Sequence, residues 1–187
     1  MASGIHTRGS ARGPLAALVL LATLVVQPGC TRLLYNFGTV EPQRVYRSSQ
    51  PSPLFLRYLV EHQGVRSLVN LRGRTPGFES DFAARHGLKL FSFDLSASRP
   101  PSQAEVMRFL EIVSDPANQP VLVHCRNGVD RTGYMLGLYR VEADGWSPER
   151  AAREMSRYLQ FGWLNPTPKR VVEQGLRATP ETSVTAP

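Results

Sequence analysis

The segment VLVHCRNGVDRTG at residues 121–133 constrains the fold of this chain more than any other feature. The short apolar run VLV between turn-forming and polar residues is typical of a buried central strand. Residues 132–143 are mostly apolar and indicate a buried helix. A strand that enters a helix through a short loop favours an α/β architecture, in which backbone N–H groups of the loop and helix start face the end of the strand.

The rest of the chain supports that architecture by alternating predicted strands and helices. Apolar patterning predicts strands over 45–48, 65–71, 88–93 and 120–124. Helical spacing predicts helices over 52–63, 78–86, 102–114, 147–160 and 167–176, and Ser102 with Glu105 forms a capping box. We therefore expect an α/β fold with a small, mostly parallel central sheet flanked by helices.

The N-terminus has the layout of a targeting segment. Arg8 and Arg12 precede an apolar run from Leu15 to Val26, which as a helix spans about 18 Å and falls short of the ~30 Å hydrocarbon core. A basic start, a short apolar core and small residues after it predict a signal peptide over 1–29. We expect a tether over 30–43, one globular domain over 44–177 and a disordered tail over 178–187.

The end of the targeting segment, QPGC, resembles a bacterial lipoprotein signal. That resemblance implies that Cys30 carries a lipid and becomes the mature N-terminus, so the protein would be an exported, membrane-anchored lipoprotein of the cell envelope or periplasm. Plain secretion and an uncleaved membrane anchor are the alternatives. The chain holds only two cysteines, Cys30 and Cys125, so a lipidated Cys30 would leave Cys125 as an unpaired thiol.

The loop after the strand combines a thiol with groups that attract anions. The predicted phosphate-binding residues are Arg126, Asn127, Gly128, Val129, Asp130 and Arg131. Their backbone N–H groups and the helix start can face a tetrahedral dianion, and the Arg131 guanidinium grips two of its oxygens. The same field favours a Cys125 thiolate at neutral pH, which can attack phosphorus without a metal or other cofactor.

The motif His-Cys-x5-Arg-Thr in HCRNGVDRTG resembles the signature loop of the protein tyrosine phosphatase superfamily. The resemblance implies that Cys125 is the nucleophile, Arg131 the phosphate ligand and Thr132 the hydroxyl that stabilises the departing thiolate. It also implies that His124 orients the cysteine. VYRSSQPS, SLVNLRG and PVLVHC are similar to segments of the atypical dual-specificity phosphatases of plants and fungi and their bacterial relatives, over about residues 44–160.

Two aspartates are candidates for the general acid that protonates the leaving oxygen. Asp94 follows the strand over 88–93 and lies 31 residues before Cys125, a spacing that resembles the dual-specificity pattern. Asp130 is the alternative, because it lies inside the loop beside Arg131. A structural role for both remains the third interpretation.

The substrate is constrained less than the reaction. A net charge of +7 suits an anionic partner. The sequence lacks the basic run with interleaved aromatic residues that would indicate nucleic-acid binding. The superfamily implies a phosphotyrosine or phosphoserine/threonine protein. That class is the first expectation, and an inositol phosphate or phosphoinositide is the alternative, which the plant and fungal likeness and Arg72, Arg74 and Arg99 on nearby loops suggest. A non-catalytic lipoprotein that binds a phosphorylated ligand is the alternative from another class.

Overall fold

The computed structural model describes residues 28–96 and 99–158, which form a five-stranded sheet in the order β1-β2-β5-β3-β4. The strands are β1 (Gly38–Glu41), β2 (Val45–Ser48), β3 (Ser67–Asn70), β4 (Lys89–Ser92) and β5 (Val121–His124). β1 runs antiparallel to β2, and all other neighbours are parallel. The predicted α/β fold with a small, mostly parallel sheet is confirmed.

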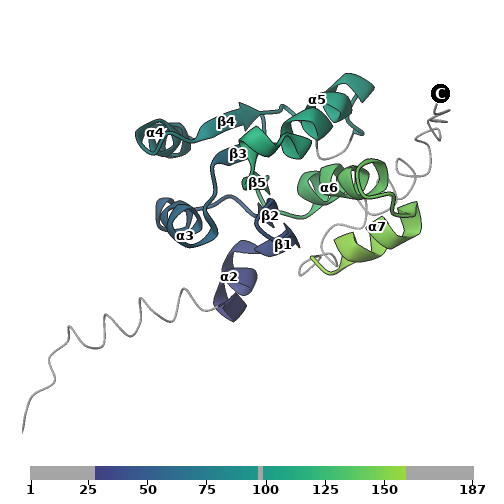
Figure 1. Ribbon diagram of the computed structural model, residues 1–187, viewed down its shortest axis with the longest axis horizontal. Helices are drawn as coiled ribbons and strands as arrows, with labels where there is room; N and C mark the ends of the chain where they lie inside the picture. Colours follow the sequence, from purple (N-terminus) through teal and green to yellow (C-terminus); the bar gives the residue numbers. More distant parts are fainter. Residues whose placement is uncertain (1–27, 97–98, 159–187) are drawn as a thin grey trace, which may run out of the picture.

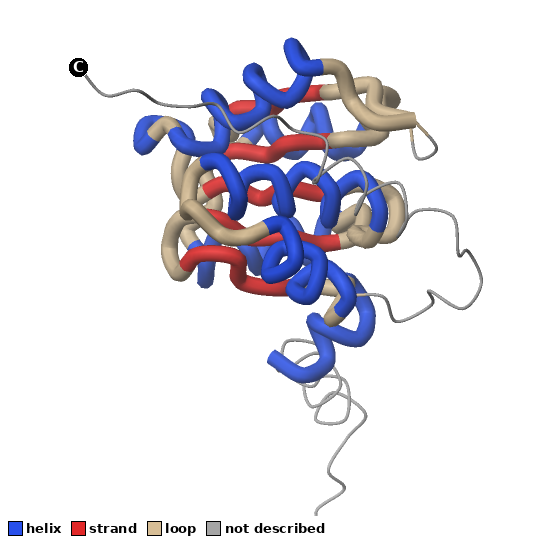
Figure 2. Tube along the Cα trace, turned by 90° about the vertical axis from the view of Figure 1, so that its right-hand side faces the viewer, coloured by secondary structure: helices blue, strands red, loops and turns tan. Residues whose placement is uncertain are grey.

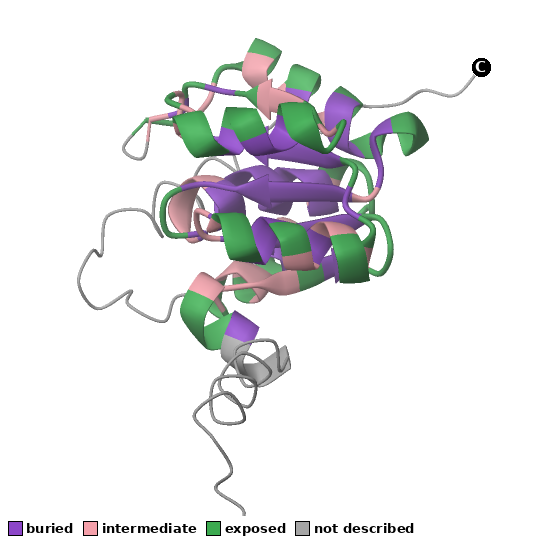
Figure 3. Cartoon of the chain, turned by 90° about the vertical axis from the view of Figure 1, so that its left-hand side faces the viewer, coloured by how far each residue is buried: buried purple, intermediate pink, exposed green. Residues whose placement is uncertain are grey.

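Helices cover both faces of the sheet (Figure 1). α3 (Pro53–Gln63) and α4 (Gly77–Arg85) lie on one face, and α5 (Gln103–Ser114), α6 (Asp130–Glu142) and α7 (Pro148–Ser156) lie on the other. Along β5, Val121 and Val123 pack toward α5 and α6, whereas Leu122 packs toward α3 and α4. This alternation buries the central strands on both sides, as Figure 3 shows in purple.

The helix starts follow the side-chain chemistry expected from the sequence. The Ser52 side chain accepts a hydrogen bond from the Phe55 N–H at the start of α3. Ser102 and Glu105 form both bonds of a capping box at the start of α5. Ser147 caps α7 in the same way by accepting from the Arg150 N–H.

The segment 30–43 is not a tether, so that prediction was wrong. It holds most of helix α2 (Pro28–Tyr35) and the edge strand β1. The Tyr35 ring stacks on the Phe55 ring at 4.0 Å between centroids, and the Phe37 ring packs edge-on against the Phe55 ring. These apolar contacts and the hydrogen bonds from β1 to β2 fix the segment on the domain.

Several predicted segments lie outside the described residues. These are the signal peptide apart from its last two positions, the helix over 167–176 and the tail over 178–187. Within 28–96 and 99–158, no helix combines the length and the apolar character that a membrane crossing requires.

The register of the parallel strands determines where a site can form. Ser48 and Asn70 both pair with His124, and Asn70 also pairs with Ser92. The four parallel strands therefore end level with one another, and the loops that follow them lie at the same edge of the sheet (Figure 2). In open α/β sheets this carboxyl edge is where ligands bind.

Candidate active site

The loop after β5 places Cys125 at the carboxyl edge of the sheet. Cys125 is 2% exposed and is a free thiol. The Gly128 N–H donates a hydrogen bond to its sulfur at 3.2 Å, so the loop folds back over the cysteine. The Gly128 N–H therefore lies next to the reactive atom of the predicted nucleophile.

Gly128 is required for this path of the loop. Its φ of +66° lies in the left-handed region that favours glycine. A Cβ atom there would lie 2.6 Å from backbone atoms of Ser48 and Ser49. The loop therefore packs directly on the end of β2, with no space for a side chain.

Helix α6 begins inside the predicted loop, at Asp130. No side chain caps its N-terminus, so the N–H groups of its first turn are available to an anion. The Arg131 Nη1 donates to the Leu95 carbonyl at 3.4 Å, and its Nε is buried without a partner in the described part of the chain. The Thr132 hydroxyl is likewise buried without a described partner, which leaves it available to a thiolate or phosphate oxygen.

His124 is held by a buried polar network. Its Nε2 lies 3.0 Å from Glu79 Oε1 on α4, and both side chains are fully buried. Gln50 donates to the other Glu79 oxygen and accepts from Arg72 Nη1 at 2.7 Å. Burial raises the pKa of Glu79, but His124, Gln50 and Arg72 outweigh this and hold it below its usual range. An ionised Glu79 only accepts hydrogen bonds, so Nε2 carries the imidazole proton.

The two candidate acids lie in different surroundings. Asp94 is exposed, and its carboxylate lies against Gly73, where an added Cβ would collide with it. The next residue, Leu95, accepts the bond from Arg131, so the Asp94 segment contacts the arginine of the loop. Asp130 is half-buried, and burial raises its pKa above the usual range while the charge of Arg131 opposes that shift.

The loop arginines do not act as one group. Arg72 bonds to Gln50 and thereby supports the His124 network. Arg74 is exposed on the loop before α4, and the charge of Arg99 acts on Glu105 at the start of α5. Arg126 is exposed on the predicted phosphate-binding loop, where Arg126, Asn127 and Val129 line a cavity of about 230 Å³ shared with α2.

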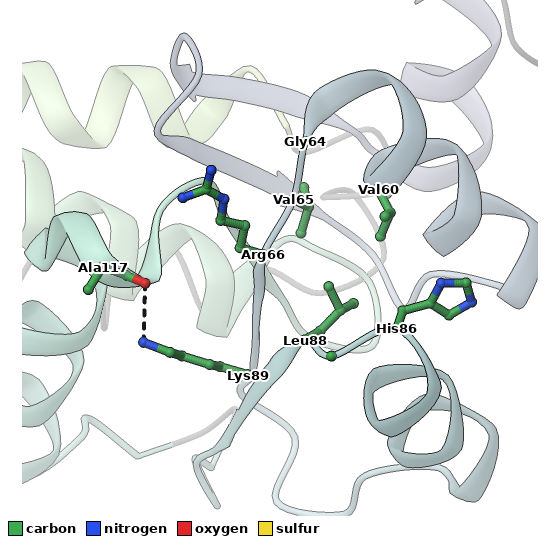
Figure 4. Close-up of a pocket in the computed structure, with 9 residues that line it drawn as sticks. Val60, Gly64, Val65, Arg66, His86, Leu88, Lys89 and Ala117 are labelled. Atoms are coloured by element: carbon green, nitrogen blue, oxygen red, sulfur yellow. Dashed lines mark hydrogen bonds between the residues drawn. The ribbon is translucent and has the colours of Figure 1, made fainter.

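A second cavity of about 390 Å³ lies at the opposite edge of the sheet (Figure 4). Arg66 and Lys89, at the starts of β3 and β4, line it, and Lys89 donates to the Ala117 carbonyl. No cluster of three metal-binding side chains occurs within the residues that the structure describes. Cys125, with its loop and helix start, is therefore the centre of the candidate site.

Sequence reasoning missed four polar residues that support the loop. Glu79 and Gln50 hold His124, while Asn36 and Arg47 bond to loop carbonyls. One signal was available for Arg47, because it is a charged residue inside the strand predicted over 45–48, and the structure buries every residue of that strand. The other three come from helix or loop positions where polar residues are ordinary.

The fold and the strand–loop–helix site define a phosphatase domain of the dual-specificity type. The chain belongs to the family described as DSP-PTPase phosphatase fused to NAD+ kinase, whose model matches residues 35–167.

Three relatives illustrate the similarity. Inositol diphosphatase DSP1 from Oryza sativa is 36% identical over 56% of this chain and 49% of its own length. The tyrosine-protein phosphatase-like protein OCA2 from Saccharomyces cerevisiae is 27% identical over 64% of this chain and 63% of its own. The solved core catalytic domain of the PP-IP phosphatase SIW14 from S. cerevisiae has a TM-score of 0.67 and 30% identity, covering 76% of this chain and 84% of that one. The chain spans about half the length of the first curated relatives it matches.

Proposed function

We propose that this protein is a cysteine-dependent phosphatase that hydrolyses phosphate esters through a phosphocysteine intermediate. The observation that carries the proposal is the Gly128 N–H directed at the buried Cys125 sulfur, beside the uncapped start of α6. Membership of a family of phosphatases supports the same reaction.

The reaction has two steps. The Cys125 thiolate attacks phosphorus, an S–P bond forms, and the bond from phosphorus to the leaving oxygen breaks while Asp94 or Asp130 donates a proton to that oxygen. Water then attacks phosphorus, gives a proton to the same aspartate, and the S–P bond breaks. Loop N–H groups and Arg131 hold the phosphoryl oxygens in both steps, and the Thr132 hydroxyl donates to the departing thiolate.

The first experiment compares two cysteine variants in turnover of an aryl phosphate. Cys125→Ser should abolish measurable turnover, whereas the matched variant Cys30→Ser should retain it. A rapid-quench digest of the wild-type protein should contain phosphate on the Cys125 peptide. Turnover that persists in Cys125→Ser would refute the mechanism. A wild-type protein that binds inorganic phosphate at this loop but never turns over would support the non-catalytic lipoprotein instead.

For the substrate, we propose inositol phosphates, including inositol diphosphates. Relatives described as inositol diphosphatases support this class. The exposed Arg126 on the loop and the exposed Arg74 nearby offer charge to phosphates beyond the one that reacts. Phosphotyrosine protein is the second class, supported by the tyrosine-protein phosphatase-like relative.

A panel at equal concentration separates the two substrate classes. It contains inositol polyphosphates, an inositol diphosphate, a soluble phosphoinositide, and phosphotyrosine and phosphoserine peptides. We expect the highest kcat/KM for an inositol compound, and Arg126→Met should lower that value more than the value for a phosphopeptide. The inositol proposal would be overturned if a phosphopeptide had the highest kcat/KM of the panel and Arg126→Met did not change the values for the inositol compounds.

We also propose that the protein is attached to a membrane by a lipid on Cys30. The sequence QPGC supports this, as do two exposed apolar side chains on α2, Leu33 at 71% and Leu34 at 59% exposure. Mass measurement of the mature N-terminus tests it directly. A diacylated Cys30 at the N-terminus is expected, and an unmodified Cys30 would contradict the proposal.

A further inference from the structure

A guanidinium lies buried directly beneath the phosphate-binding loop. Arg47, in the middle of β2, is 1% exposed. Its Nη2 donates to the Gly128 carbonyl at 2.7 Å, and its Nε is buried without a partner among the described residues. None of the ion pairs within the described part of the chain involves Arg47.

Such a cation is costly to bury without an opposing charge. Burial lowers the pKa of Arg47 to about 10, and electrostatic interactions with Tyr158, Cys125 and Glu154 oppose the lowering, so the side chain stays charged at neutral pH. Glu154 already forms an ion pair with Arg140. The charge of Arg47 is therefore available to the thiolate and to a phosphate bound above the loop.

A second donor approaches the loop from α2. Asn36 has a φ of +49°, a left-handed conformation that asparagine tolerates better than most residues. Its Nδ2 lies 3.2 Å from the Asn127 carbonyl, 3.2 Å from the Gly128 carbonyl and 3.1 Å from the Tyr158 carbonyl. Its neighbour Tyr35 is fixed by the stack on Phe55 and by accepting from the Ser49 N–H at 2.6 Å.

Tyr158 connects the two donors. Its carbonyl accepts from Asn36, and its ring lies under the Arg47 guanidinium, 3.7 Å from carbon to centroid. A Cβ at Gly38 would lie 2.3 Å from the Tyr158 hydroxyl oxygen, so only glycine leaves room for the ring there. Gly38 also pairs with Arg47 across β1 and β2.

The peptide geometry translates these contacts into chemistry. In a trans peptide the N–H and C=O groups point in opposite directions. The peptide that joins Asn127 and Gly128 directs its carbonyl toward Asn36 and its N–H toward the Cys125 sulfur. The next peptide directs the Gly128 carbonyl toward Arg47, which turns the Val129 N–H to the opposite side.

Taking Cys125 as the nucleophile proposed above, we propose that Asn36 and Arg47 are positioning residues of the phosphate-binding loop. They hold the carbonyl groups of Asn127 and Gly128 away from the cysteine, so that the N–H groups of these two peptides face the thiolate and the phosphate. Arg47 adds a fixed positive charge beneath the loop, which works with Arg131 and against Asp130 at the start of α6.

The test uses the full chain and four variants. Arg47→Met removes the charge, and Arg47→Lys restores it without the planar fork. Asn36→Asp places an acceptor beside the two carbonyls. Arg66→Met is the matched control, because Arg66 is exposed at the opposite edge of the sheet. Thermal unfolding of each variant establishes that it folds.

The main readout is alkylation of Cys125 by iodoacetamide as a function of pH, followed on the Cys125 peptide by mass spectrometry so that Cys30 does not interfere. Arg47→Met should raise the pH midpoint of alkylation by about one unit. The same variant should weaken the protection of Cys125 from alkylation by inorganic phosphate. Asn36→Asp should likewise raise the midpoint and weaken this protection. In Arg47→Lys the midpoint should lie between those of Arg47→Met and the wild type. We expect kcat/KM for an aryl phosphate to fall about 10²-fold in Arg47→Met, the usual effect of losing one donor to a developing anion.

Folded variants at either position with the wild-type alkylation midpoint and wild-type phosphate protection would overturn the positioning role. Where Arg47→Met does not fold, Arg47→Lys and Asn36→Asp decide by the same criteria. Alkylation and phosphate protection do not require turnover. A protein in which these variants shift both, while the wild type hydrolyses no phosphate ester, would keep the positioning role and refute the proposed function.

Discussion

The loop proposed to bind phosphate and the segment that starts at Asp94 lie at the same edge of the sheet but are held differently. Carbonyls of the loop accept bonds from three residues outside it, namely from the Gln50 N–H, Asn36 and Arg47. The Asp94 segment forms a bridge to Arg72, and its Leu95 carbonyl accepts a 3.4 Å bond from Arg131, while the Asp94 side chain stays exposed.

In the proposed reaction, this difference matches two separate tasks of catalysis. Groups that stabilise charge on a phosphoryl group work best when they are preorganised and shielded from water. A general acid must meet leaving groups of different shapes, and an exposed carboxylate is suited to that task. The rigid half of the site is therefore expected to set the binding of phosphate, and the exposed half to set the dependence on the leaving group.

Arg131 joins the two regions, so its removal should have the largest effect. Arg131→Met should lower kcat/KM for an aryl phosphate by about 10³-fold, because a fixed charge on the phosphoryl oxygens is lost. Arg126→Met removes an exposed guanidinium from the same loop and should cause a much smaller loss. Equal losses in steady-state kinetics would mean that only the total charge of the loop matters.

The acids should respond according to the leaving group. If Asp94 is the acid, Asp94→Asn should lower turnover of an alkyl phosphate by about 10²-fold and spare a nitrophenyl phosphate, which needs no proton. Asp130→Asn should then change the two substrates equally. The reverse pattern in parallel kinetic measurements would assign the acid to Asp130, whose raised pKa keeps its proton available at higher pH.

Gly128 tests how tightly the loop is packed. Gly128→Ala should lower kcat/KM by tenfold or more, because the new methyl group collides with the backbone of β2 and moves the Gly128 N–H from the sulfur. Gly87→Ala is the matched control, since Gly87 has a φ of +64° and open space around it. In urea unfolding, Gly87→Ala should cost about 1 kcal/mol of backbone strain, Gly128→Ala should cost more because of the collision, and only Gly128→Ala should lose activity.

Glu79 offers the most pH-dependent effect. Glu79→Gln should lower the free energy of unfolding by about 1–3 kcal/mol at pH 7, because a buried bond to His124 is weakened. The pKa of Glu79 is lowered by folding, so its contribution is complete above its unfolded value of about 4.3 and is lost as pH falls through the folded value. Urea unfolding at pH 7 and near pH 3 should show the difference between variant and wild type shrinking, and a constant difference would argue against an ionised Glu79.

Part of the fold and the centre of the site could be read from neighbouring residues. The strands 45–48 and 120–124, the capping box of Ser102 and the loop from Cys125 to Arg131 all depend on local patterns. The edge strand β1 was missed because its four residues have no apolar alternation and gain their partner only from β2.

The sequence by itself determined which groups meet around Cys125, because a strand, a glycine turn and a helix start are contiguous along the chain. Only the tertiary structure decided what holds them. Asn36, Arg47, Glu79 and Tyr158 come from four separate segments and reach the loop through sheet register and helix packing. The orientation of a carbonyl depends on the nearest donor in space, and for this loop those donors lie many residues away along the chain.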